Sequence, residues 1–141
     1  MAYDPNNIFA RIVRGELPCH RVYEDADTLV FMDLMPQSPG HTLVIPKIAG
    51  ENLLDTPPDS IAAAMCVTQR VARAVKKAFD AKGIVITQFN GAAAGQTVFH
   101  LHFHVIPVYT LGGLGLHARS MADAAVLAEQ AEKVRQALTA E

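Results

Sequence analysis

The spacing of apolar residues along the chain predicts alternating groups of helices and strands. Apolar side chains recur with the 3.6-residue spacing of a helix in three stretches, and alternating or β-branched apolar residues fill five shorter ones. The expected elements are helices from about residue 6 to Gly15, over 57–82 and after Asp123, and strands over 21–24, 28–33, 41–46, 83–89 and 98–107. This order of helix, strands, helix, strands and helix is typical of an α+β fold.

Capping and turn residues mark the ends of these elements. The acidic run 25–27 favours a tight turn, so the first two strands should form a hairpin, and the strand at 83–89 should pair antiparallel with the one at 98–107. The expected helix caps are Asp4 or Asn6, then Thr56 or Asp55, and finally Asp123. The expected apolar faces of the long and the last helix are Ile61, Met65, Thr68, Val71, Val75 and Phe79, and Val126, Leu127, Val134 and Leu138.

Three histidines at alternate positions interrupt an otherwise apolar stretch. In a strand, His100, His102 and His104 would share one face, while the residues between them would pack on the other. Alternate strand residues lie roughly 6–7 Å apart, so the two outer histidines would be roughly 13 Å apart and at most two of the three could share a metal ion. The face therefore indicates either reactive imidazoles or a two-histidine metal site.

Length and charge narrow the class of protein. A chain of 141 residues with 50% hydrophobic content predicts one domain over 1–141, with a core over about 6–110 and a C-terminal tail and helix over 111–141. The 12 basic and 14 acidic residues give a formal charge of −2, without the basic stripe that nucleic-acid binding requires. We therefore expect no nucleic-acid partner.

Cysteine usage and hydropathy bear on the compartment. Cys19 and Cys66 are isolated, which fits neither a disulfide framework nor a C-x-x-C metal or redox motif. No apolar run approaches the ~20 residues that span a bilayer, and the first residues lack the basic and apolar regions of a signal peptide. These features predict a cytoplasmic protein that does not interact with membranes.

The histidine stretch and several motifs before it resemble the histidine triad (HIT) family. His100-Leu101-His102-Phe103-His104-Val105-Ile106 matches the signature His-x-His-x-His-x-x with hydrophobic x, and Gly95-Gln96-Thr97-Val98 matches the segment before it. The other matching segments, in the family's order, are Ile8-Phe9, Glu16-Leu17-Pro18, Phe31-x-Asp33, Pro36-Gln37-x-Pro39-Gly40-His41 and Leu43-Val44-Ile45-Pro46-Lys47. The resemblance covers roughly residues 6 to 107.

This resemblance implies a fold, an activity and a set of site residues. The implied fold is a homodimeric α+β domain with a five-stranded antiparallel sheet. The implied activity is cleavage or transfer at the α-phosphate of purine nucleotides, without a cofactor. His102 would be the nucleophile, oriented by His41 and His100, with His104 acting on the phosphate or leaving group. The implied substrate contacts are Ile8, Phe9, Ile12 and Phe31 for the base, Asp33 for the ribose, and Gln96, Thr97 and Asn90 for the phosphate or leaving group.

Elementary chemistry supports these roles. A neutral imidazole, with an ordinary pKa of about 6.5, keeps one bare nitrogen for attack when an acceptor holds the proton on the other nitrogen. Attack at phosphorus develops negative charge, which backbone N–H groups around 95–97 and additional imidazoles can stabilise. A glycine–alanine loop lets that backbone approach closely.

The chain also departs from the family pattern. Many bacterial relatives hold a structural zinc with an N-terminal C-x-x-C pair, a later histidine and the first triad histidine. Here Asn7, Ala10 and Ala49 stand at three of those positions, so we expect no metal. The family's phosphate-contacting amide falls near Phe89, where the neighbouring Asn90 or Gln88 could substitute.

Other interpretations of the same residues remain open. The four apolar pocket residues would also suit an ordinary core, and His41 could simply bond a loop carbonyl. Gly112, Gly113 and Gly115 could suggest a phosphate loop, but without strand–helix context they predict a flexible connection. The function is therefore either a nucleotide hydrolase or a non-catalytic nucleotide-binding or interaction module, or else a metal-binding protein that uses His100 and His102.

Overall fold

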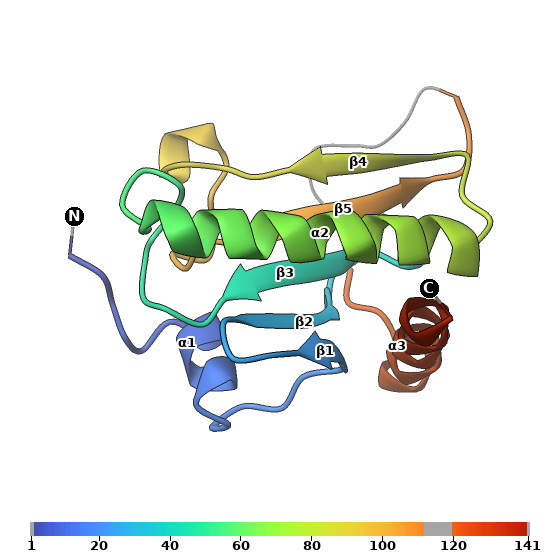
Figure 1. Ribbon diagram of the computed structural model, residues 1–141, viewed down its shortest axis with the longest axis horizontal. Coiled ribbons are helices and arrows are strands. Elements are labelled where there is room, and N and C mark those ends of the chain that lie inside the picture. Colours follow the sequence, from blue (N-terminus) through green and yellow to red (C-terminus); the bar gives the residue numbers. More distant parts are fainter. Residues whose placement is uncertain (1, 112–119, 141) are drawn as a thin grey trace.

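A computed structural model describes residues 2–111 and 120–140 of the chain, so the glycines at 112, 113 and 115 lie outside the described residues (Figure 1). Its elements follow the expected order of helix, strands, helix, strands and helix. They are α1 (Ile8–Val13), β1 (Arg21–Glu24), β2 (Thr28–Met32), β3 (Thr42–Pro46), α2 (Pro58–Ala78), β4 (Gly83–Thr87), the 3-10 turn η1 (Ala92–Ala94), β5 (Phe103–Val108) and α3 (Ala124–Thr139).

The five strands form one antiparallel sheet in the order β1-β2-β3-β5-β4. Helices α2 and α3 pack against the sheet and each other, and α1 lies beside the β1–β2 end, near the N-terminus (Figure 1). The predicted α+β class, the hairpin and the antiparallel pairing of β4 with β5 are confirmed. Because β5 lies between β3 and β4, the histidine segment comes next to the strand that follows His41.

The two faces of the sheet bury different clusters. One cluster joins the sheet to α2 and α3, and the other joins it to α1. Alternation along β3 shows the division, since Val44 belongs to the first cluster while Leu43 and Ile45 belong to the second. Strands β2 and β3 are consequently buried along their whole length. The α1 side of the sheet also carries the candidate site.

The histidine strand is shorter than its sequence pattern predicts. β5 begins at Phe103, so His100 and His102 precede it in irregular backbone. Leu101 N–H donates to Gly50 O at 2.9 Å, and the carbonyl of Val98 accepts from the Gln96 side chain. These backbone groups therefore bond to loop residues instead of to a neighbouring strand. The alternation persists nevertheless, because Leu101, Phe103 and Val105 all enter the helix-side core.

Two of the expected helix caps are wrong. Asn7, rather than Asp4 or Asn6, caps α1 by accepting from Ala10 N–H, because Asp4 accepts from Asn6 N–H in the preceding turn. α2 follows Pro57 without a side-chain cap, since Asp55 and Thr56 bond within the loop before it. The α3 cap is confirmed, and its residue accepts from Ala125 N–H.

The helix faces are buried more narrowly than predicted. Met65 and Val126 are both exposed, although the sequence places them on apolar faces. Small residues occupy the tightest contacts instead, with Ala64 and Ala74 of α2 and Ala131 of α3 fully or almost fully buried. Alanine lets the helices approach the sheet closely, so flanking longer side chains point outward. Among the helices of the described residues, none has the length and apolar character needed to cross a membrane.

Candidate active site

A cavity of about 470 Å³ opens on the α1 side of the sheet. Strand alternation explains its wall, because His41 and Leu43 line the cavity while Val44 packs in the cluster on the other face. The cavity size is within the range of small-molecule sites. The sequence-predicted residues that it brings together are Ile8, Phe9, Ile12, Phe31, Asp33, His41, Thr97, His102 and His104.

The inner wall of the cavity is apolar. Ile8 and Ile12 lie one turn apart on α1, and the rings of Phe9 and Phe31 meet edge to face with centroids 5.3 Å apart. Sequence reasoning missed several further lining residues: Cys19, Met35, Gln37, Leu43, Val98 and Met121. Leu43 was predictable from its alternation with His41. Met121 carried no such signal, because Ala122 N–H bonding to Leu34 O brings the distant C-terminal segment to the cavity.

His102 presents a bare ring nitrogen. Its Nδ1 lies 2.7 Å from the carbonyl oxygen of His100, and because a carbonyl only accepts, Nδ1 carries the proton and Nε2 does not. The ring packs edge to face on Phe9 with centroids 4.9 Å apart. Burial lowers the pKa of His102 to about 4, so the ring is neutral at pH 7. The side chain therefore has a lone pair suited to nucleophilic attack.

His100 lies behind the cavity wall rather than on it. Its Nε2 lies 2.7 Å from the carbonyl of Pro46, which fixes the proton there, and its bare Nδ1 accepts from the hydroxyl of Tyr3 at 2.6 Å. Burial lowers the pKa of His100. Sequence reasoning did not find Tyr3, because it stands before the first matching motif and no periodicity marks it. The two flanking bonds hold His100 on both sides.

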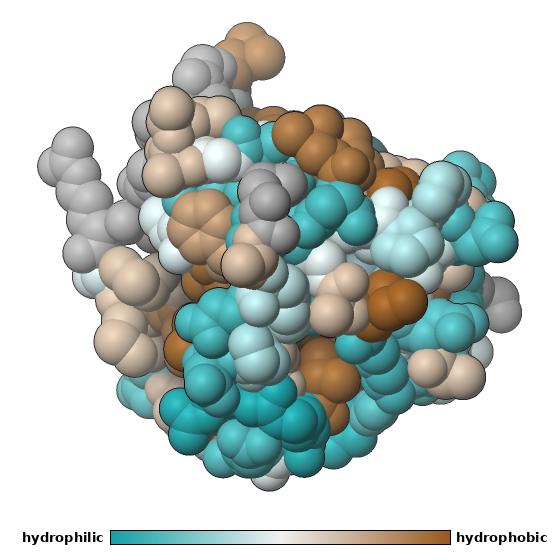
Figure 2. All heavy atoms as spheres, turned by 90° about the vertical axis from the view of Figure 1, so that its left-hand side faces the viewer, coloured by the Kyte–Doolittle hydropathy of each residue, from teal (hydrophilic) through white to brown (hydrophobic). Residues whose placement is uncertain are grey.

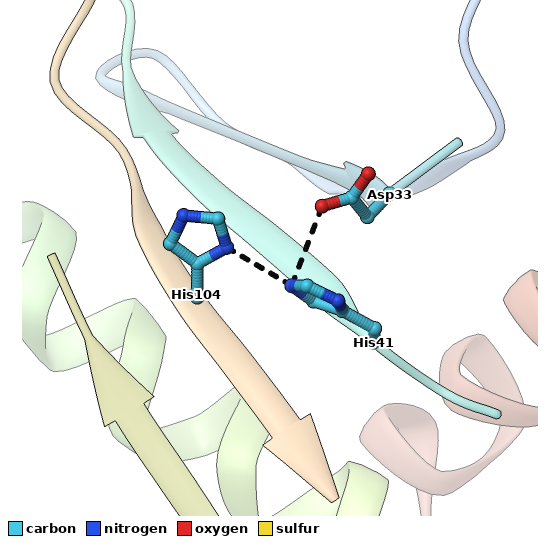
Figure 3. A group of neighbouring side chains, drawn as sticks. All are labelled: Asp33, His41 and His104. Carbon is cyan, nitrogen blue, oxygen red and sulfur yellow. Dashed lines mark hydrogen bonds and ion pairs between the residues drawn. The ribbon is translucent and has the colours of Figure 1, made fainter. Parts of the chain in front are cut away.

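His41 contacts a different triad histidine from the one that the sequence predicted. The backbone N–H of Gln37 donates to Nδ1 of His41 at 3.0 Å, so the His41 proton lies on Nε2. That proton faces Nδ1 of His104 at 2.9 Å and an oxygen of Asp33 at 3.3 Å (Figure 3). The structure thus places His41 on His104, not on His102. Because Nδ1 of His104 accepts in this contact, a proton on its ring lies on Nε2.

The loop between β2 and β3 holds His41 in this position. Ser38 Oγ donates to Pro107 O at 2.5 Å, and the hydroxyl of Tyr109 donates to Pro39 O at 2.6 Å, so the C-terminal end of β5 and the loop are tied together. Gly40 adopts φ +96°, and an added Cβ would lie 2.9 Å from the ring of Phe79. This glycine lets the chain turn tightly against α2 just before His41.

Asp33 combines burial with one strong hydrogen bond. One carboxylate oxygen accepts from Met35 N–H at 2.8 Å, and the other faces His41. Burial raises the pKa of Asp33 to about 6. The carboxylate is therefore ionised but poorly solvated at pH 7, a state in which paired hydroxyl donors from a ligand would be favourable.

Asp33, His41 and His104 also form the one set within the described ranges whose ligand atoms, all within 4.8 Å of one another, could surround an ion. The Gln37 N–H bond argues against that use, because it keeps the His41 proton on Nε2, the atom a metal would need. The zinc ligand set that the resemblance suggested does not fit either. Asn7 serves as a helix cap, Ala10 and Ala49 lack ligand atoms, and both ring nitrogens of His100 are engaged.

Two predicted phosphate contacts lie outside the cavity. Gln96 is buried, with Oε1 accepting from Gly91 N–H at 2.8 Å and Nε2 donating to Glu51 O at 2.6 Å. Asn90 Oδ1 accepts from Leu53 N–H at 2.9 Å, and Gln88 bonds to Asn90 in turn. These amides organise the loop that carries Thr97, which does line the cavity. Their contact with a phosphate stays a prediction.

Known proteins resemble the chain in sequence and structure. The family model described as HIT domain matches residues 14–111. The crystal structure of a Hit-like protein involved in cell-cycle regulation from Bartonella henselae aligns with a TM-score of 0.90 at 51% identity, covering 96% of this chain and 99% of that one. A Zn-bound histidine triad family protein from Mycobacterium smegmatis aligns with a TM-score of 0.85 at 39% identity, covering 96% and 94%. Adenylylsulfatase HINT3 of Arabidopsis thaliana is 42% identical over 100 residues, which are 71% of this chain and 51% of that protein.

Replacing Asp33 by asparagine tests the electrostatic cost of the site. The pKa of Asp33 is about 6 in the folded chain against an ordinary 3.8, so ionisation of this carboxyl costs stability as the pH rises from about 4 to 6. The unfolding free energy of Asp33→Asn, relative to wild type, should therefore increase by about 2 kcal/mol between pH 4 and pH 7 and stay constant above pH 7. Urea denaturation at several pH values measures this difference. Parallel pH profiles for the two proteins would contradict the assignment.

Proposed function

The chain belongs to the histidine triad (HIT) family, and we propose that it is a nucleotide-binding hydrolase that cleaves at the α-phosphate through a nucleotidyl-histidine intermediate. The proposed substrate classes are nucleoside phosphoramidates, aminoacyl adenylates and dinucleoside polyphosphates. One observation carries the proposal. His102 is buried and neutral, and its proton is held on Nδ1 by the His100 carbonyl, which leaves Nε2 bare at the cavity.

The cavity offers a separate environment for each part of a nucleotide. A purine ring suits the apolar wall of Ile8, Phe9, Ile12 and Phe31, and the ribose hydroxyls can donate to the Asp33 carboxylate. The α-phosphate would then lie beside His102, His104 and Thr97. The adenylylsulfatase name of one relative agrees with a substrate that carries an adenylyl group.

The proposed reaction has two displacements at phosphorus. In the first, the lone pair on Nε2 of His102 forms a P–N bond while the bond from phosphorus to the leaving group breaks. The leaving group takes a proton from His104 in its imidazolium form, so that the ring is left as a neutral imidazole that can take a proton back in the second step. In the second, water attacks phosphorus, the P–N bond breaks, and His104 accepts a proton from the water. The ring of His102 keeps its Nδ1 proton throughout.

The fixed hydrogen bonds around the site explain why little rearrangement is needed. As His102 bonds to phosphorus, its ring becomes cationic, and the His100 carbonyl 2.7 Å from Nδ1 stabilises that charge. The N–H groups of Gly95 and Gln96 already donate to Ala92 and Gly91 within the loop, so Thr97, which lines the cavity, is the residue of this loop that can meet the negative charge on the phosphoryl oxygens. Catalysis here rests on groups that are already oriented before the substrate binds.

The alternative of a non-catalytic module requires the same cavity but no turnover. A metal-binding role through His100 and His102 has less support, because Pro46 O and Tyr3 engage both ring nitrogens of His100. The proposed compartment is the cytoplasm, in keeping with the free thiols Cys19 and Cys66.

Substitution of His102 tests the proposed function. His102→Asn and His102→Gly should lower kcat for an adenosine phosphoramidate by about a thousandfold or more, while nucleotide affinity stays within about tenfold, since base and ribose contacts lie elsewhere. His20→Asn, which removes a histidine outside the cavity, is the matched control. Rapid-quench capture of labelled nucleotide should place the label on His102 of the wild-type chain.

Three results would contradict the proposal. They are label on another residue, near-normal kcat in His102→Gly, and nucleotide binding by the wild type without release of AMP. Turnover should also be unchanged by a chelator. Loss of activity in chelator that zinc restores would favour the metal-based alternative.

We also propose that the protein is a homodimer. β4 is an edge strand whose Val85 and Ile86 are exposed, and neighbouring α2 carries small residues that permit close packing across a two-fold axis. Light scattering at micromolar concentration should give about twice the 15.2 kDa mass of the chain. A mass near 15.2 kDa would contradict the dimer.

A further inference from the structure

The N-terminal segment makes a specific contact with the triad that the proposed mechanism does not use. The hydroxyl of Tyr3 donates to Nδ1 of His100 at 2.6 Å, and the two rings meet edge to face with centroids 5.8 Å apart. His100 is almost completely buried, whereas Tyr3 is partly exposed. The contact joins residues 97 positions apart in the chain. A random surface contact would not be expected to satisfy a buried nitrogen at this distance.

The residues between Tyr3 and α1 form a hydrogen-bonded turn, which holds Tyr3 beside the triad. Asp4 accepts from the N–H of Asn6 through its side chain and from the N–H of Asn7 through its carbonyl. Arg14, at the end of α1, donates to the carbonyl of Pro5 at 2.6 Å. These bonds close a turn over residues 4–7 and tie it to the helix. Figure 2 views the end of the molecule from which the N-terminal segment extends, where hydrophobic side chains lie in separate clusters among hydrophilic ones.

We propose that Tyr3 is a positioning residue for His102 and acts through His100. Three hydrogen bonds meet at His100, and two of them link the segment to the nucleophile. Tyr3 O–H donates to Nδ1 of His100, Nε2–H of His100 donates to Pro46 O, and the backbone carbonyl of His100 accepts from Nδ1–H of His102. The first two bonds hold the ring of His100 at both nitrogens. The third transmits its position to the ring that attacks phosphorus.

The backbone around His100 is irregular, so the bonds to its ring add to what fixes the position of its carbonyl. Residues 98–102 precede β5, so the ladder with β3 begins only at Phe103 and does not fix the carbonyl of His100. Leu101 N–H belongs to the same peptide group as that carbonyl and is held by Gly50 O, while the two side-chain bonds of the His100 ring hold the Cα to which this peptide is attached. A shift of that carbonyl would loosen the bond that keeps the His102 proton on Nδ1, and a proton on Nε2 would block attack.

The chemistry of Tyr3 suits this role. Partial burial raises the pKa of Tyr3, so the phenol stays protonated and acts as a donor across the physiological range. The phenol also adds no charge beside a histidine that burial keeps neutral. Phenylalanine would preserve the ring contact and remove only the donor, leaving Nδ1 of His100 without its partner.

A double-mutant cycle tests the inference, which rests on the proposed function. Tyr3→Phe should lower kcat for an adenosine phosphoramidate about tenfold and leave KM within about twofold, because the substrate contacts are intact. In a His100→Ala background the same substitution should have no further effect, since its target is gone. Tyr23→Phe is the matched control, because it also removes one tyrosine hydroxyl bond, to Asp25 at 2.9 Å, but on the hairpin away from the cavity.

Nitrogen-15 NMR of the histidine side chains provides a readout that a purely structural role would not move. Tyr3→Phe should shift the Nδ1 resonance of His100 and increase the population of His102 protonated on Nε2, whereas Tyr23→Phe should leave both unchanged. The inference is overturned by kcat within twofold of wild type, by multiplicative effects in the cycle, or by unchanged His102 resonances. If the wild-type chain released no AMP, the proposed function would fail, and the NMR comparison would still decide whether Tyr3 positions His102.

Discussion

The positions of the histidine protons depend on a few backbone groups whose donor or acceptor character cannot change. The carbonyls of Pro46 and His100 can only accept, and the N–H of Gln37 can only donate. Their contacts therefore fix the neutral tautomers of His100, His102 and His41, and the Nε2–H of His41 makes Nδ1 of His104 an acceptor. The chemistry of the site follows from this pattern, because one imidazole is left with a bare nitrogen and its neighbour with a proton to donate.

The sheet brings these backbone groups together. Pro46 ends β3, His41 precedes the same strand, and β5 pairs beside it, so groups more than fifty residues apart meet within hydrogen-bond distance. The two clusters pack against β3 from opposite faces of the sheet. This close packing keeps Pro46 O in place, 2.7 Å from Nε2 of His100. Burial contributes a second effect, since it keeps the rings neutral and raises the pKa of Asp33.

Much of the fold and of the cavity lining could be predicted from the sequence, because both rest on periodicity and on contiguous motifs. Alternation identified β3 and the packing of Leu101, Phe103 and Val105, and the family resemblance identified nine residues that line the cavity. The start of β5 and two of the three helix caps were missed because loop contacts compete with local propensity.

Tyr3 and the backbone of Gln37 were missed for a different reason. The role of Tyr3 depends on a contact with a residue far away in the sequence, and the role of Gln37 depends on its backbone N–H rather than on its side chain. No pattern of side chains in the sequence indicates either role. Gln96 illustrates the converse case. The motif predicts a phosphate contact, whereas the side chain of Gln96 bonds to Gly91 and Glu51 in the structure. The sequence alone does not show these two partners.

The tautomer of His102 is the most direct test of this view of the site. Long-range nitrogen–proton correlation spectra of the nitrogen-15-labelled protein at pH 7 distinguish the two ring nitrogens. We expect His102 to be neutral, with its proton on Nδ1 and a bare Nε2. A spectrum in which His102 is protonated on Nε2, or on both nitrogens, would contradict the claim that the His100 carbonyl prepares this ring for attack.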